Sequence, residues 1–135
     1  MKKMKRFAAL IVAAVSVSAV GISAYAATNQ YPYYYELKTP GYGGADWSNA
    51  AEKLNNASYA EFEVENGYIS SGAYAYVSVF KSPSVGNSIS EEVKVDDVGP
   101  THKTYYTVLR GAGSMNYLGA NGSYYGVQFT GHWNP

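Results

Sequence analysis

Cysteine is absent from this chain of 135 residues, and histidine occurs only twice. Without cysteine the protein has no disulfide bond, no thiolate nucleophile and no thiol that could carry a lipid anchor. The two histidines, His102 and His132, have no partners at the spacing of a zinc site, and neither accompanies a Gly-x-Ser-x-Gly motif. We therefore predict no metal, no cofactor and no catalytic residue, and expect a protein that is not an enzyme and works by binding.

Acidic residues are missing from the first part of the chain, where none precedes Glu36. In contrast, four of the ten basic residues, Lys2, Lys3, Lys5 and Arg6, occupy the first six positions. If this N-terminal segment is removed, six basic and ten acidic residues remain and the net charge is −4. Such a chain does not fit nucleic-acid binding, because phosphates have to be neutralised by a stripe of cations.

The first 26 residues have the three parts of a secretory signal peptide. The basic start precedes an apolar run over residues 7–20, and Ala24 and Ala26 place small residues at the −3 and −1 positions of a cleavage site. We expect cleavage between Ala26 and Ala27, with cleavage after Ala24 as the alternative.

An uncleaved membrane anchor is the other interpretation of this segment. It is disfavoured because the apolar run is shorter than the roughly 20 residues that a membrane span requires. The expected product is therefore a secreted single domain of residues 27–135 with no membrane span. One hydrophobic core is enough to stabilise a chain of this length.

The rest of the chain has the periodicity of a β protein. In residues 59–65, Ala60, Phe62 and Val64 fall on one face and three glutamates fall on the other. About seven strands of this kind are expected, at residues 33–38, 59–65, 73–80, 88–96, 101–110, 115–120 and 124–133. We predict an all-β fold, an antiparallel β-sandwich, with a small barrel as the alternative.

Two local patterns refine this prediction. Asp46 is a candidate N-cap followed by good helix formers, so one short helix is expected near residues 46–54, within a long connection from residue 39 to residue 57. Asn66-Gly67 and Asn121-Gly122 are dipeptides that tolerate positive φ, and each predicts a tight turn between strands.

Acidic residues form a row at alternate positions 61, 63 and 65. A calcium-binding or sugar-hydrolysing cluster is one interpretation of this row. A solvated sheet face, with lysines from an adjacent strand pairing with the carboxylates, explains the pattern better, because unpaired like charges on one face repel each other.

Tyrosines occur in runs at residues 33–35, 105–106 and 124–125. Neighbouring residues of a strand point to opposite faces, so part of each run is expected at the surface, where Tyr offers an apolar ring and a hydroxyl. Core filling is the alternative role for such rings. We predict that the surplus forms a surface for a glycan or another protein. The candidate binding residues are Tyr33, Tyr34, Tyr35, Trp47, Tyr105, Tyr106, Tyr124, Tyr125 and Trp133.

Three sequence segments carry a resemblance to a known family. The segments Tyr35-Glu-Leu-Lys38, Leu118-Gly-Ala-Asn-Gly-Ser123 and Val127-x-Phe129-x-Gly131-x-Trp133, after a signal peptide, resemble a family of small exported proteins of Gram-positive bacteria whose function is uncharacterised. That family is similar to the lactococcin-type bacteriocins, which are also cysteine-free exported β-proteins. The family ending Gly-x-Trp-Ser-Pro-Asp differs from Gly131-His-Trp-Asn-Pro135 in this chain. The resemblance implies no catalytic residue.

The resemblance implies a bacteriocin-like antimicrobial protein that acts at the cell envelope. The alternative is a wall- or matrix-associated interaction module without toxicity. In either case the expected partner is a cell-envelope component or another protein. The net charge of −4 disfavours a direct attack on anionic membranes, because such membranes attract basic segments.

Overall fold

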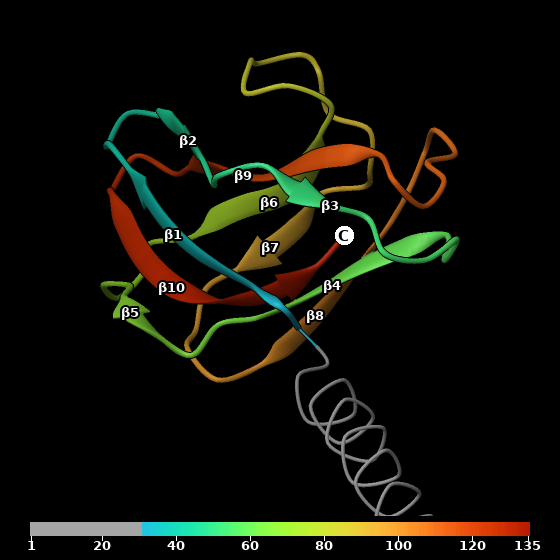
Figure 1. Ribbon diagram of the computed structural model, residues 1–135. Coiled ribbons are helices and arrows are strands. Elements are labelled where there is room, and N and C mark those ends of the chain that lie inside the picture. Colours follow the sequence, from blue (N-terminus) through green and yellow to red (C-terminus); the bar gives the residue numbers. More distant parts are fainter. Residues whose placement is uncertain (1–30) are drawn as a thin grey trace, which may run out of the picture. The chain divides into compact units, whose positions relative to one another are not determined.

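Ten β-strands make up the part of the chain that the structure, a computed structural model, describes, which is residues 31–135 (Figure 1). The predicted signal peptide and its cleavage site at Ala26/Ala27 lie outside the described residues. The strands are β1 (Tyr33–Thr39), β2 (Ala45–Trp47), β3 (Ala51–Glu52), β4 (Tyr59–Glu63), β5 (Asn66–Tyr68), β6 (Ala75–Phe80), β7 (Val93–Val95), β8 (Thr101–Tyr105), β9 (Met115–Gly122) and β10 (Val127–Asn134). Within residues 31–135 no helix is long and apolar enough to cross a membrane.

The strands form two antiparallel sheets of five strands each, the two layers of a sandwich (Figure 1). Sheet A has the order β1-β10-β4-β8, and β5 also pairs with β10. Sheet B has the order β2-β9-β6-β7, and β3 also pairs with β9. The predicted all-β antiparallel sandwich is therefore confirmed. The expected number of seven strands is too low, because short strands form within segments that the sequence marks as loops and turns.

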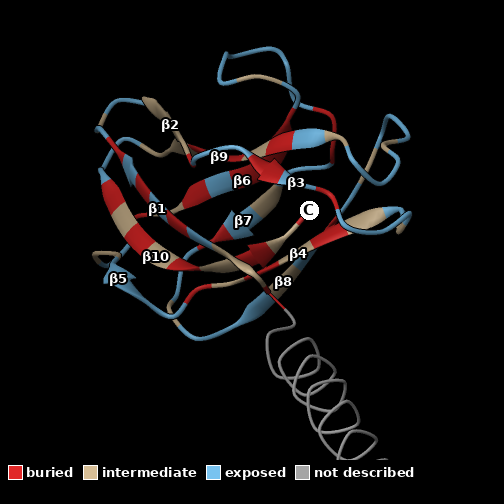
Figure 2. Ribbon diagram, viewed as in Figure 1, coloured by how far each residue is buried: buried red, intermediate tan, exposed pale blue. Residues whose placement is uncertain are grey.

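The hydrophobic core lies between the two sheets. Figure 2 shows buried and more exposed residues alternating along β1 and β10, as the two-residue repeat of a strand requires. The alternation predicted for residues 59–65 is confirmed, because Ala60 and Phe62 on β4 and Val64 just after it are completely buried. The largest fully buried apolar side chains are Tyr35, Leu37, Phe62, Val64, Val77, Val79, Val95, Leu118, Phe129 and Trp133.

The prediction of a short helix near residues 46–54 is wrong. The segment instead forms β2 and β3, which both pair with β9. The Asp46 carboxylate does not cap a helix, because it accepts a hydrogen bond of 2.7 Å from the backbone N–H of Lys38. Ser48 exchanges backbone and side-chain hydrogen bonds with Leu118 on β9. Pairing along β9 thus overrides the local helix propensity.

Neither Asn-Gly pair forms the tight turn that its sequence predicts. Asn66 and Gly67 begin β5, and Asn121 and Gly122 end β9. Gly67 is needed for a close approach rather than for positive φ, because a Cβ there would lie 2.7 Å from the Cα of Phe129. The actual connection between β9 and β10 is the segment 123–126, so the last strand begins at Val127 and not at residue 124.

Candidate binding face

The outer face of sheet A, which points away from the core, carries polar and aromatic side chains on three neighbouring strands. On β1 these residues are Tyr34, Glu36 and Lys38, which lie opposite His132, Thr130 and Gln128 on β10. On the other side of β10, β5 places Asn66 opposite Thr130 and Tyr68 opposite Gln128. Side chains directly opposite each other in an antiparallel pair share a face. These eight residues therefore form one surface, which we call the β10 face.

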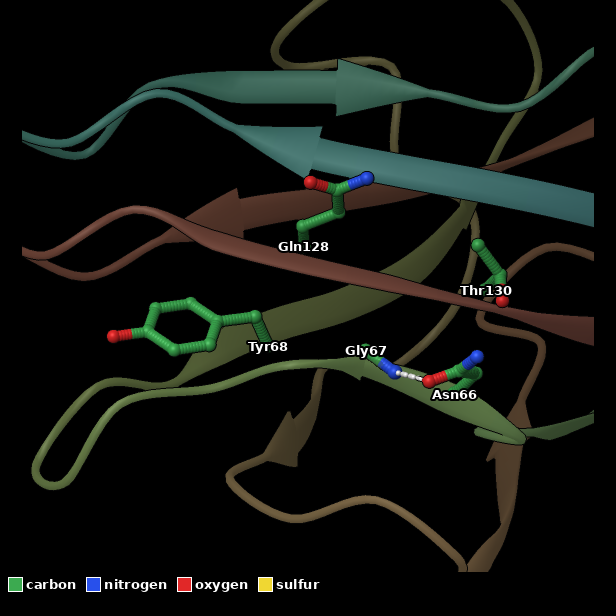
Figure 3. A pocket seen from close by; sticks show the side chains of 5 residues that line it. All are labelled: Asn66, Gly67, Tyr68, Gln128 and Thr130. Carbon is green, nitrogen blue, oxygen red and sulfur yellow. Dashed lines mark hydrogen bonds between the residues drawn. The ribbon is translucent and has the colours of Figure 1, made fainter.

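Two adjoining hollows lie on the β10 face. One has a volume of about 260 Å³ and is lined by Asn66, Gly67, Tyr68, Gln128 and Thr130. Figure 3 shows these residues, with Tyr68 and Asn66 on β5 and Gln128 and Thr130 on the neighbouring strand β10. The other hollow has a volume of about 230 Å³ and is lined by Lys38, Thr39, Tyr68, Gly126, Val127 and Gln128. The two hollows share Tyr68 and Gln128, so they are parts of one depression along β10.

The local sequence explains the first hollow. Gly67 has no side chain and faces the backbone of β10, which lets β5 approach closely enough to pair with it. The Asn66 side chain accepts a hydrogen bond of 2.8 Å from the N–H of Gly67, the next residue, which orients the Asn66 amide (Figure 3). Tyr68 lies opposite Gln128 on the outer face and is 71% exposed. The ring is therefore available to a ligand.

Two of the three glutamates at positions 61, 63 and 65 have a basic partner. Glu61 lies 3.1 Å from Lys103 on β8, and this carboxylate accepts a hydrogen bond that raises the pKa of the Lys103 ammonium. Glu65 lies 2.6 Å from Nδ1 of His132. Cross-strand pairing with a lysine, which the sequence predicts for this row, is confirmed at Glu61. Among residues 31–135, no group of three or more acidic or histidine side chains is arranged to hold a metal ion.

A cluster of three exposed tyrosines lies at the end of β10 where the second hollow is. The rings of Tyr42 and Tyr124 are 4.7 Å apart between centroids, at an angle of 75°. The rings of Tyr124 and Tyr125 are 5.3 Å apart, at 89°. A hydrogen bond with the Tyr42 side chain raises the pKa of Tyr124. We call these three residues the tyrosine cluster.

Two loops hold the tyrosine cluster together. The backbone N–H of Tyr42 donates a hydrogen bond of 2.9 Å to the carbonyl oxygen of Tyr124, and Gly43 donates one of 3.2 Å to Ser123. Tyr42 has a φ of 65°, a left-handed conformation that is an outlier for a bulky side chain. Gly126, next to Tyr125, lines the second hollow. The tyrosine cluster therefore adjoins the β10 face.

The aromatic residues singled out in the sequence divide into two groups. Tyr35 and Trp133 are buried in the core, so they are not available to a partner. Tyr33 and Tyr106 are half-buried against the core, and Trp47 is half-buried beside Phe80. The exposed residues are Tyr34, Tyr105, Tyr124 and Tyr125. The runs 33–35 and 105–106 do divide between the two faces, as predicted. In the third run both rings are exposed, because residues 124 and 125 lie in a loop.

Sequence reasoning missed the two most exposed tyrosines of residues 31–135, Tyr42 at 81% and Tyr68 at 71%. Each stands next to residues that mark turns, Tyr42 between Gly41 and Gly43 and Tyr68 directly after Gly67. A large aromatic ring beside glycine has little local chain to pack against. This pattern, rather than tyrosines in succession, is the signal that could have found them.

The two histidines face opposite sides of sheet A. His102 on β8 lies opposite Phe62 and stacks on its ring, with centroids 5.0 Å apart, and burial lowers the pKa of His102. His132 belongs to the β10 face, where its ring and the ring of Tyr34 meet edge to face, with centroids 5.6 Å apart. The two rings are thus separated by the sheet and do not form one site.

Comparison with family models, with curated proteins and with solved structures finds no match to this chain.

Proposed function

We propose that this chain is an exported, non-enzymatic binding protein that holds a component of the cell envelope on the β10 face. The observation that supports this most directly is the pair of adjoining hollows that share Tyr68 and Gln128. Ligand sites are concave surfaces that combine aromatic side chains with a few polar groups that fix orientation. The β10 face has this composition, and the tyrosine cluster extends it with further exposed rings.

Of the two functions considered from the sequence, the wall- or matrix-associated interaction module fits this face better. Tyrosine side chains on rigid strands are suited to holding a ligand, since a tyrosine loses little side-chain entropy on binding, and the amide side chains supply adaptable hydrogen bonds. The bacteriocin-like activity implied by the sequence resemblance stays a prediction. Growth inhibition of competing bacteria by the purified protein would favour it, and wall binding without inhibition would favour the module.

The proposal is tested by sedimentation with insoluble cell wall. Purified protein is expected to sediment with the wall, and Tyr68→Ser is expected to weaken this binding about tenfold, a loss of roughly 1.4 kcal/mol. The matched control is Tyr76→Ser, because Tyr76 is also an exposed strand tyrosine but lies on sheet B. Equal binding of all three proteins, or no binding by any of them, would contradict the proposal.

A further inference from the structure

We infer that the ligand is a linear sugar chain of low charge, which occupies the two hollows of the β10 face and continues over the tyrosine cluster. This inference rests on the proposed function and deepens it by naming the ligand class. It follows from three features that are independent of one another: the size and arrangement of the hollows, the chemistry of their lining, and the backbone conformation of Tyr42.

The hollows fit consecutive units of a polymer. Each is smaller than the roughly 300–1,000 Å³ of a pocket for a drug-sized ligand, so each fits a unit the size of one sugar ring. They follow each other along β10, from Thr130 in the first to Gly126 in the second. At about 3.3 Å per residue this stretch of strand is roughly 13 Å long. A linear ligand with two consecutive units can therefore fill both hollows.

The lining of the hollows fits sugars better than it fits ions. Asn66, Gln128 and Thr130 offer amide and hydroxyl groups that both donate and accept hydrogen bonds, as the hydroxyls of a sugar do. Tyr68 adds an exposed ring on which the C–H face of a sugar can stack. Charge is nearly balanced here. Lys38 is the only cation that lines the hollows, and Glu36 lies two residues before it on β1. The Glu36 carboxylate accepts a hydrogen bond of 3.2 Å from Gln128.

The acidic residues of sheet A also argue against a polyanionic ligand. Glu61, Glu63 and Glu65 lie on the same sheet, and the sequence after the predicted signal peptide has a net charge of −4. A polyanion such as teichoic acid would need a basic surface to bind. This favours a wall glycan of low charge over a phosphate polymer.

The tyrosine cluster has the geometry of a stacking platform. Because its rings meet edge to face, at 75° and 89°, each ring keeps a face that its neighbour does not cover. All three rings are exposed, Tyr42 at 81%. Gly126, which lines the second hollow, belongs to the same loop as Tyr124 and Tyr125, so a sugar chain that extends beyond this hollow meets the loop that carries these rings.

Tyr42 shows that the cluster does not serve folding alone. Its φ of 65° is a strained conformation for tyrosine, and asparagine or glycine would adopt it more easily. The Tyr42 ring gains little burial in return, since most of it remains in solvent. A strained and exposed aromatic residue is explained by a ligand that the ring contacts.

The test measures how affinity depends on ligand length. Chito-oligosaccharides, from the disaccharide to the hexasaccharide, are titrated into the purified protein by calorimetry. We expect affinity to rise at least tenfold with length. Tyr42→Asn is expected to remove most of this gain with length, and Tyr68→Ser is expected to weaken binding at every length. Tyr76→Ser serves again as the control.

Tyr42→Asn also separates a binding role from a structural one. Its unfolding midpoint in urea is expected to be at least as high as that of the wild type, because asparagine tolerates the left-handed conformation. A lower midpoint together with weaker binding at all lengths would mean that Tyr42 is structural, and would overturn its assignment to the ligand.

The other outcomes distinguish the two proposals. If the protein binds insoluble wall through Tyr68 but no chito-oligosaccharide, or if it binds teichoic acid or a wall protein instead, the sugar-chain inference is wrong and the proposed function stands. Binding that is independent of length overturns the extended site. If neither wall nor oligosaccharide is bound, both proposals fail.

Discussion

At the scale of single residues, tyrosine has two roles in this protein, and the strand repeat separates them. Tyr34 and Tyr35 are neighbours on β1, yet the first is 57% exposed on the β10 face and the second is 1% exposed in the core. The hydroxyl of Tyr35 donates a hydrogen bond of 2.7 Å to the backbone carbonyl oxygen of Glu63. Gly131, which lies opposite Tyr35 on β10, leaves the space for this contact, because a Cβ there would collide with the same carbonyl.

Replacement of Tyr35 by Phe tests this contact. Removing the hydroxyl leaves a carbonyl without its partner inside the sandwich, so we expect the free energy of unfolding to fall by about 1–3 kcal/mol at neutral pH. Tyr34→Phe is the matched control and is expected to change it by less than about 0.5 kcal/mol. Urea unfolding at pH 7 measures both values. Equal stability of the two variants would show that the Tyr35 hydrogen bond contributes nothing.

The same pair of variants predicts a pH dependence. Burial, with smaller contributions from Glu65 and Glu63, raises the pKa of Tyr35 above its ordinary value of 10.0. The folded state then keeps the phenol proton that the unfolded state releases, so stability is complete below about pH 10 and falls as the pH rises further. Tyr35→Phe should show a shallower loss above pH 10 than Tyr34→Phe. Part of the loss remains in both variants, because burial also raises the pKa of Tyr106.

At the scale of strands, β5 depends on one glycine. Gly67→Ala would place a methyl group against the backbone of β10, and we expect this overpacking to lower the free energy of unfolding by about 1–3 kcal/mol. Tyr68 would move with β5, so wall binding should weaken as well. The control is Gly111→Ala, where the nearest atom to the new Cβ is 3.6 Å away and φ is not positive. Comparable stability of both variants, measured by urea unfolding, would contradict the close approach.

The strands also show how much the sequence could predict. Strands with a clear two-residue alternation, such as β4 and β10, are recognised because one face is buried. The pairs Asn66-Gly67 and Asn121-Gly122 mislead, since each glycine serves a close approach that depends on a distant segment, β10 for Gly67 and Thr39 for Gly122. Likewise, residues 46–52 follow β9 rather than their own helix propensity.

The candidate site is less visible in the sequence than the fold is. Exposed rings in the runs at 33–35 and 105–106 follow from alternation, but the hollows depend on which strands are neighbours. Tyr68 and Gln128 are 60 positions apart in sequence numbering and meet only because β5 pairs with β10. Periodicity places a residue on a face of its own strand. It does not show which strand lies beside it.

At the scale of the whole described unit, the fold depends on β10. This last strand lies between β1 on one side and β4 and β5 on the other, and it pairs Tyr33 near the start of the unit with Trp133 near its end. Sheet A therefore cannot form from neighbouring segments alone. Loops between such distant partners have to close before pairing can stabilise them, which slows folding.

We therefore expect slow, cooperative folding. Refolding from urea, followed by the fluorescence of Trp47 and the buried Trp133 and by circular dichroism, should take milliseconds to seconds, as in other β-sandwiches, and both signals should change together. A chain that ends at residue 126 should remain unfolded, because β1, β4 and β5 all lose the strand with which they pair. Deletion of the loop residues 84–86 is the control, since all three are exposed and lie outside the strands. Refolding within microseconds, or a folded chain without β10, would show that local contacts rather than the pairing of the two ends determine this fold.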